Sequence, residues 1–155
     1  MRRKEKEITD EQRLERIFRK NRSCCLGLTD GRYPYTVPVS YGYKDGCLYF
    51  HGAQAGKKND LIGRNPSAGF CIWNEEALVS ADTPCGWGVK FESIVGYGDI
   101  EILDDPVDKK TALDIIMEHH GGKGPFEYPA PMLDKTALMV LRIKGFTGKG
   151  FKQVL

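Results

Sequence analysis

The sequence has no apolar run that approaches the length of a membrane span, no internal repeat and no linker-like break. Its formal net charge is only +2, which argues against a broad nucleic-acid-binding surface. The charged start MRRKEKEITD is not followed by an apolar segment, so it does not read as a secretory signal. We therefore expect a single domain over residues 1–155, located in the cytoplasm, that binds neither membrane nor nucleic acid.

Cysteine pairs with metal-binding or redox spacing are also missing. The chain has an odd number of cysteines and no CxxC motif; they are Cys24, Cys25, Cys47, Cys71 and Cys85. Four of them lie in apolar strand-like runs, which predicts buried thiols in a reducing cytoplasm.

The common catalytic and nucleotide-binding motifs are absent as well. GAQAGKKN has only three residues between Gly52 and Gly56, and it has Lys-Asn where a P-loop has Lys-Ser or Lys-Thr. The sequence contains no GxSxG, no HExxH and no recognisable pair of catalytic carboxylates. His119 and His120 fall in the last turn of a predicted helix, where imidazoles cap carbonyls, so we predict no metal site.

Two segments have helical patterns. ITDEQRLERIFRKN begins with a capping-box pattern at Thr9 and Gln12. Its apolar stripe consists of Leu14, Ile17 and Phe18. Asp105-Pro106 opens a second helix that ends at Gly121. The residues predicted to face inward from this helix are Ala112, Leu113, Ile116 and Met117.

Most of the remaining chain has strand patterns, including the alternating Cys24, Leu26 and Leu28. YPYTVPVSYGY joins CLYFH through an Asp45-Gly46 hairpin turn, and its Pro38 suggests an edge, a bulge or a barrel seam. Further strands are predicted for NPSAGFCIW, GWGVKFESIVGYGDIEIL and TALMVLRIKGFTGK, with loops at 74–85 and 121–134. Six or so mostly antiparallel strands with outer helices predict an α+β domain built on a small β-barrel.

A strand–loop–helix unit, LYFHGAQAGKKNDLIGRNP, carries the clearest ligand-binding pattern. Its strand ends at His51, and the small residues that follow let backbone N–H groups approach a ligand. Lys57 and Lys58 open the helix, where the helix dipole is already positive. Either these lysines are simply solvated, or an anion such as phosphate docks between them and the helix start. His51 alone is more typical of a hydrogen-bonded strand-end histidine than of a catalytic acid.

The order of YTVPVSYGY, LYFHGAQAGKKNDLIGRNPSAGFCIW, CGWGVKFESIVGYGDIEIL and LMVLRIKGFTGK resembles the pyridoxamine 5′-phosphate oxidase-related split-barrel flavoproteins. Within them, the chain is most similar to the 5-nitroimidazole resistance (Nim-type) branch, over about residues 1–149. The resemblance implies a six-stranded antiparallel split β-barrel with flanking helices. It also implies a homodimer with FMN at the interface, FAD being compatible too.

The resemblance further assigns site residues. Lys57 and Lys58 match the basic pair that grips the FMN phosphate. The residues that match flavin-contacting strand positions are Val39, Ser40, Tyr41, Phe50, His51 and Gly52. Ser93 stands where true pyridoxamine phosphate oxidases carry a flavin-contacting glutamine. His51 matches a histidine that lines the pocket beside the flavin.

The chain ends at FKQVL, without the segment that gives true pyridoxamine phosphate oxidases their substrate-binding arginine and histidine, so that oxidation is not expected. The resemblance instead implies an FMN-dependent oxidoreductase that reduces nitroaromatic or other electron-poor small molecules. In this reading His51 donates a proton or orients the substrate. A non-catalytic flavin-binding module for storage or sensing remains an open alternative.

Overall fold

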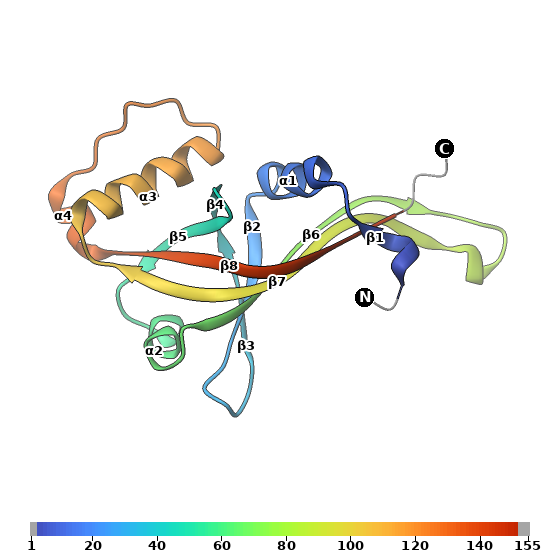
Figure 1. Cartoon of the computed structure of the whole chain (residues 1–155), viewed down its shortest axis with the longest axis horizontal. Helices are drawn as coiled ribbons and strands as arrows, with labels where there is room; N and C mark the ends of the chain where they lie inside the picture. The colour runs from blue at the N-terminus through green and yellow to red at the C-terminus, as the bar shows by residue number, and fades with distance from the viewer. Residues whose placement is uncertain (1–2, 152–155) are drawn as a thin grey trace.

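The computed structural model describes residues 3–151 as a curved sheet with helices on its outside (Figure 1). The strands are β1 (Glu7–Ile8), β2 (Ser23–Leu28), β3 (Tyr35–Ser40), β4 (Gly42–Lys44), β5 (Cys47–Ala53), β6 (Ser67–Val79), β7 (Gly88–Leu103) and β8 (Thr136–Gly150). The α-helices are α1 (Glu11–Lys20), α2 (Lys57–Arg64), α3 (Pro106–His119) and α4 (Ala130–Lys135). Single 3₁₀ turns lie at Lys4–Lys6 and Pro84–Gly86.

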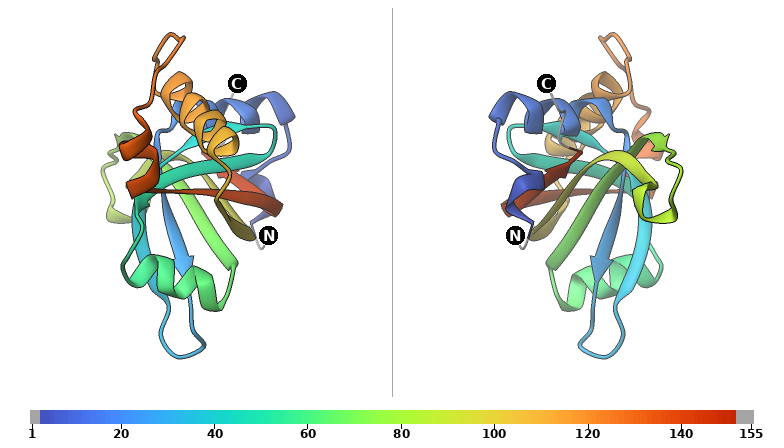
Figure 2. Two further views of the ribbon diagram at one scale, coloured as in Figure 1. Left: turned by 90° about the vertical axis from the view of Figure 1, so that its left-hand side faces the viewer. Right: turned by 90° about the vertical axis from the view of Figure 1, so that its right-hand side faces the viewer.

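Hydrogen bonds order the strands as β3-β2-β6-β7-β8-β5-β4, with β1 added to β8. Every pairing is antiparallel. The long β6, β7 and β8 form the middle of the sheet, and the sheet curls so strongly that its two ends approach each other (Figure 2). The end strands β3 and β4 are not paired with each other, so the barrel is not closed. This is the α+β split-barrel architecture that the sequence predicts.

Residues 3–151 form eight strands rather than the six predicted, partly because YPYTVPVSYGY divides into β3 and β4 at Tyr41. Tyr41 leaves the ladder: its N–H donates to the carbonyl of Arg22. The next residue, Gly42, packs against α3 so closely that a Cβ atom there would lie 2.7 Å from Cα of Ile116. The short β1 accounts for the other additional strand.

The predicted turn and edge are confirmed. Asp45 and Gly46 have φ values of 49° and 72°, as a two-residue turn of the primed type requires, and they join β4 to β5. Pro38 lies in β3, the outermost strand at one end of the sheet. β3 pairs with a neighbour on one side only, so on its open side a proline does not interrupt a ladder of hydrogen bonds.

The caps of the two long helices follow the sequence with one correction. The N-cap of α1 is Asp10, not Thr9: the Asp10 carboxylate accepts a 2.6 Å hydrogen bond from the N–H of Arg13. Asp105 caps α3 as predicted, accepting from the N–H groups of Val107 and Asp108. Gly121 follows α3 with φ of 95°, a conformation that glycine adopts readily.

Apolar side chains form two buried clusters. The larger fills the curl of the sheet beneath α1 and α2 and includes Phe18, Tyr41 and Phe50. The smaller lies between the sheet and α3 with α4, and it includes Ala112, Leu113 and Ile116. Met117, predicted to face inward, is instead 40% exposed because it lies on the outer side of α3.

Other predictions need correction. Residues 74–79 continue β6 rather than forming a loop, because the ladder with β7 resumes after an irregularity between Glu75 and Ala77. The predicted loop at 121–134 contains most of α4. The five cysteines are all free, but only Cys24 is buried; Cys25 and Cys85 are exposed. In the described residues, no helix combines the length and apolar character needed to span a membrane.

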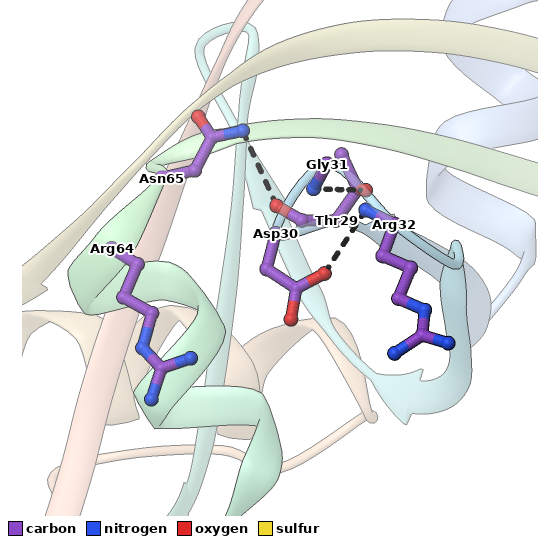
Figure 3. Close-up of a pocket in the computed structure, with 6 residues that line it drawn as sticks. All are labelled: Thr29, Asp30, Gly31, Arg32, Arg64 and Asn65. Atoms are coloured by element: carbon purple, nitrogen blue, oxygen red, sulfur yellow. Dashed lines mark hydrogen bonds between the residues drawn. The ribbon is translucent and has the colours of Figure 1, made fainter.

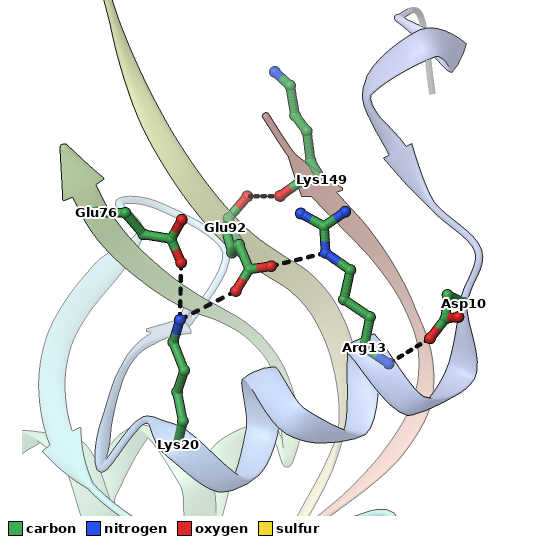
Figure 4. A network of polar contacts seen from close by, with 7 residues as sticks. Asp10, Arg13, Lys20, Glu76, Glu92 and Lys149 are labelled. Atoms are coloured by element: carbon green, nitrogen blue, oxygen red, sulfur yellow. Dashed lines mark hydrogen bonds and ion pairs between the residues drawn. The ribbon is translucent and has the colours of Figure 1, made fainter. Parts of the chain in front are cut away.

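A buried carboxylate fixes α1 to the sheet (Figure 4). Glu92 on β7 accepts hydrogen bonds from Nε of Arg13 at 2.8 Å and from Nζ of Lys20 at 3.1 Å, and Lys20 also contacts the exposed Glu76. Burial alone would raise the pKa of Glu92, but the two cations outweigh it and the net shift is downward. Glu92 is thus an ionised structural residue in the described structure.

Candidate functional site

The loop before α2 presents backbone donors. Gly56, with φ of 128°, is the N-cap and provides no side-chain hydrogen bond, so the first N–H groups of α2 have no partner inside the helix. Nδ2 of Asn59 turns back and donates to the carbonyls of Ala53 and Gln54, both at 2.7 Å. These contacts hold the loop in place and leave the helix start open to an anion.

Two lysine side chains flank this helix start. Nζ of Lys57 lies 4.9 Å from the ring centroid of Tyr35, and Nζ of Lys58 lies 5.9 Å from that of Phe50. Neither lysine forms an ion pair within the described part of the chain. Lys58 is partly buried, which lowers the pKa of its ammonium group. Because a partly buried, unpaired cation is unfavourable, the geometry favours an anion partner over simple solvation of Lys58.

A glycine on β5 makes room for that cation. A Cβ atom on Gly52 would lie 2.9 Å from Nζ of Lys58, so the missing side chain lets the ammonium group lie against the strand. β5 also extends beyond its neighbour: β4 pairs only with residues 47–49, whereas β8 pairs with residues 47–53. The end of β5 therefore has an open edge beside Lys58, to which a planar ligand can hydrogen-bond.

His51 lies on the other face of β5. Because side chains alternate along a strand, Phe50 and Gly52 face Lys58 while His51 points to the side of α3. Partial burial lowers the pKa of His51. Lys58 and His120 lie close enough to lower that pKa further by electrostatic repulsion. His51 thus stands at the rim of the lysine site rather than inside it.

The two histidines at the end of α3 lie close to backbone carbonyls, as predicted. These carbonyls belong to other segments of the chain, not to α3 itself. Nε2 of His119 lies 2.7 Å from the carbonyl oxygen of Asn21, and Nε2 of His120 lies 3.0 Å from that of Tyr41. Nδ1 of His119 accepts from the N–H of Tyr43 at 3.4 Å. Within residues 3–151, no cluster of three potential metal ligands occurs.

The other residues predicted to contact flavin on β3 to β5 differ in how exposed they are. Val39 packs partly against the core and Ser40 is exposed, both on the edge strand β3. Tyr41 is fully buried, and its hydroxyl donates to the carbonyl of Phe18 at 2.8 Å. Its ring therefore packs in the hydrophobic core. Phe50 is also fully buried and borders the site only through its contact with Lys58.

Ser93 does not join the lysine site within one chain. It pairs with Trp73 and Lys149, whereas Gly52 lies near the Leu103 end of β7. Ser93 and Leu103 are ten positions apart, about 33 Å along the contour of β7. Within one chain, Ser93 and Gly52 therefore lie beside different parts of this strand.

A cavity that the sequence does not predict lies at the other end of α2 (Figure 3). It has a volume of about 480 Å³ and is lined by Arg64, Asn65 and the β2–β3 turn, including Asp30 and Arg32. Arg64 follows Lys57 by seven residues, which puts both on one face of the helix about 10 Å apart. Lys57 does not line the cavity, so this spacing alone does not indicate it.

The fold agrees with comparisons to known proteins. A protein-family model described as pyridoxamine 5′-phosphate oxidase matches residues 10–149. The chain belongs to this family. Members of this family bind FMN, and the uncapped helix start, the two lysines and the space at Gly52 fit a flavin phosphate. FMN is therefore the cofactor, with FAD also compatible.

Solved structures support the same fold. A candidate 5-nitroimidazole antibiotic resistance protein from Bacteroides thetaiotaomicron is 32% identical, with a TM-score of 0.82 and coverage of 92% of this chain and 85% of that one. An FAD and haem binding protein from Mycobacterium smegmatis has a TM-score of 0.86 at 17% identity, covering 95% and 74%. An FAD-binding protein from Mesorhizobium loti has a TM-score of 0.69 at 20% identity, with coverage of 92% of this chain and 96% of that one. A comparison with curated proteins gave no match.

Proposed function

We propose that this chain is an FMN-dependent oxidoreductase that reduces nitroaromatic compounds, such as 5-nitroimidazoles, or other electron-poor small molecules. The observation that carries the flavin part is the partly buried, unpaired Lys58 beside an uncapped helix start and a glycine. The 32% identity to a candidate nitroimidazole resistance protein supports the choice of substrate class.

The chain's own residues provide binding and orientation. Lys57, Lys58 and the first N–H groups of α2 hold the phosphate through charge-assisted hydrogen bonds. The open edge of β5 next to Gly52 supplies backbone groups for the planar ring. When bound, the flavin would supply the redox chemistry of this reaction.

His51 is the proposed proton donor or substrate-orienting group. Its position at the rim, on the face of β5 opposite Lys58, suits contact with a small acceptor rather than with the phosphate. Protonation of the reduced acceptor needs a group that gains and loses a proton near neutral pH, and histidine is the side chain suited to that task.

The proposed assembly is a homodimer in the cytoplasm with flavin at the interface. Large apolar side chains are exposed on the outer face of the sheet: Trp73, Val95 and Tyr97 are 58%, 55% and 62% exposed. Ser93 lies on the same face, paired with Trp73. If this face covers the lysine site of a second copy, Ser93 reaches the flavin from the partner, which explains its distance from Lys58 within one chain.

The test is single-turnover reduction of a 5-nitroimidazole by chemically reduced holoprotein, compared with the same concentration of reduced free FMN. The proposal predicts faster reduction by the holoprotein and a loss of most of that advantage in His51→Gln. A holoprotein that binds FMN but gives no acceleration over free FMN identifies the chain as a flavin-binding module for storage or sensing. A protein that gains no flavin absorbance contradicts both functions.

A further inference from the structure

Two cysteines face each other across neighbouring strands. Cys25 on β2 and Cys71 on β6 are direct partners in the antiparallel register. Their chain neighbours Cys24 and Ile72 are buried in the core, so the alternation of side chains puts Cys25 and Cys71 together on the outer face of the sheet. Both thiols are free, and Cys25 is exposed.

The spacing of such a pair is close to what a disulfide needs. Directly opposed residues of an antiparallel pair have Cα atoms about 4.5–5.5 Å apart, inside the usual disulfide range of about 4.4–6.8 Å. Their Cβ atoms are about 4.5–5.5 Å apart, slightly beyond the usual 3.5–4.5 Å, so closure needs a small local movement. Bonds of this exposed, slightly strained kind are the readily reduced ones.

We propose that Cys25 and Cys71 form a reversible cross-strand disulfide, which makes the outer face of the sheet a redox-sensitive modification site. Neither the family match nor the proposed flavin chemistry requires this pair, because the cysteines lie on β2 and β6, whereas the lysine site of the same chain lies on β5 and α2. The chain between them contains β3, β5 and α2, so the bond would enclose the whole lysine site in one covalent loop.

The step balances with hydrogen peroxide as oxidant. The exposed Cys25 sulfur attacks one peroxide oxygen, the O–O bond breaks, and a sulfenic acid and one water form. The Cys71 sulfur then attacks the Cys25 sulfur, the S–O bond breaks, and a second water leaves with both thiol protons accounted for. The two thiols lose two electrons, which the peroxide gains. Burial, and the neighbouring Cys25, raise the pKa of Cys71, consistent with its acting second.

The experiment treats purified full-length protein with hydrogen peroxide, quenches it, and counts free thiols under denaturing conditions. Hydrogen peroxide is small enough to reach a thiol even where this face pairs with a second copy. We expect the count to fall from five to three and to return to five after dithiothreitol. Digestion with trypsin and a glutamate-specific protease separates Cys71 from Cys85, and the cross-linked peptides should join residues 23–32 to the segment containing Cys71.

Single variants assign the bond. After the same treatment Cys25→Ser should retain all four remaining thiols. In Cys71→Ser the Cys25 sulfenic acid finds no second thiol, so three free thiols should remain and no cross-linked peptide should form. Cys24→Ser is the closest control, because it removes the neighbouring core thiol whose pKa burial raises to about 12, and it should still lose two thiols. Cys85→Ser, an exposed cysteine far along the chain, should also lose two.

Three results would overturn the proposal. The thiol count could stay at five, the bond could join another pair of cysteines, or a reducible band of twice the chain mass could show that the link runs between copies. Because none of these readouts uses flavin or activity, failure here leaves the flavin proposal to its own test.

Discussion

The ammonium group of Lys58 occupies the space beside Gly52, where a Cβ atom would lie 2.9 Å from Nζ. This relationship links the first turn of α2 to the end of β5, because Lys58 follows Gly52 by only six positions. It explains why a strand that ends in a ligand site carries glycine rather than a β-branched residue. The cation lies against the backbone, partly buried and without an ion pair among residues 3–151, where we propose that it binds a phosphate.

Gly52→Ala tests this contact. The added methyl group displaces Nζ of Lys58, which lies at the end of a flexible side chain, so the apo fold should keep its thermal midpoint or gain slightly. Loss of one charge-assisted contact should weaken FMN binding by about tenfold. Fluorescence titration and thermal unfolding of the same sample measure the two effects. Unchanged affinity would show that Lys58 does not hold the phosphate in this position.

The acid form of His51 should limit the proposed reduction. Burial lowers its pKa below the usual value near 6.5, and the charges of Lys58 and His120 lower it further. The rate of nitroimidazole reduction should therefore fall as pH rises through that lowered pKa. His51→Gln should lose this dependence and run about a hundredfold slower at low pH. Identical pH profiles of parent and variant would remove His51 from the proton-transfer step.

Glu92→Gln should destabilise the fold without changing the lysine site. Glu92 is buried and receives hydrogen bonds from Arg13 and Lys20, and losing its charge should cost about 1.5–3 kcal/mol of unfolding free energy at pH 7. Its lowered folded pKa means that this stability is present above the usual value and is lost as pH falls through the folded pKa.

The matched control for that variant is Glu76→Gln. Glu76 contacts the same Lys20 but is exposed, so its removal should cost less than about 1 kcal/mol. Urea denaturation at pH 7 and pH 4 measures both variants. Equal losses in the two would show that burial of Glu92 adds nothing to the ion pair.

A separate stability change should appear at mildly acidic pH. Burial lowers the pKa of His119 despite its bond to Asn21, and its Nδ1 accepts from the N–H of Tyr43, so the fold requires the neutral ring. A lowered folded pKa gives stability that is full above about pH 6.5 and is lost as pH falls toward the folded value. Urea midpoints between pH 7.5 and 5 should decline less in His119→Gln, with His51→Gln as the control for the other shifted histidine.

Much of the fold could be predicted from sequence patterns that involve only a few adjacent residues. The Asp45-Gly46 turn, the Asp105 cap and the edge position of Pro38 each depend on a few adjacent residues, and all were confirmed. The division of β3 from β4 was missed because Gly42 is shaped by contact with Ile116, far along the chain. The cysteines were misjudged because alternation turns Cys25 outward beside the buried Cys24.

The candidate site was predictable in its charges but not in its geometry. Lys57 and Lys58 at a helix start are visible in the sequence, yet only the structure shows that Gly52 makes room for one of them. Family resemblance grouped Tyr41 and Ser93 with the lysines. That grouping stays a prediction: the Tyr41 ring lies in the core of one chain, and Ser93 lies ten positions along β7 from Leu103.

The central claim is that Lys57 and Lys58 bind the phosphate of FMN, and it is tested most directly by comparing FMN with riboflavin, which lacks that phosphate. The parent should prefer FMN, and the double variant Lys57→Ala, Lys58→Ala should lose several kcal/mol of FMN binding, at about 1.5–3 per contact, with little change for riboflavin. Arg64→Ala removes a cation from the same helix face about 10 Å away and should keep the preference. A double variant that still prefers FMN as strongly as the parent would contradict the account.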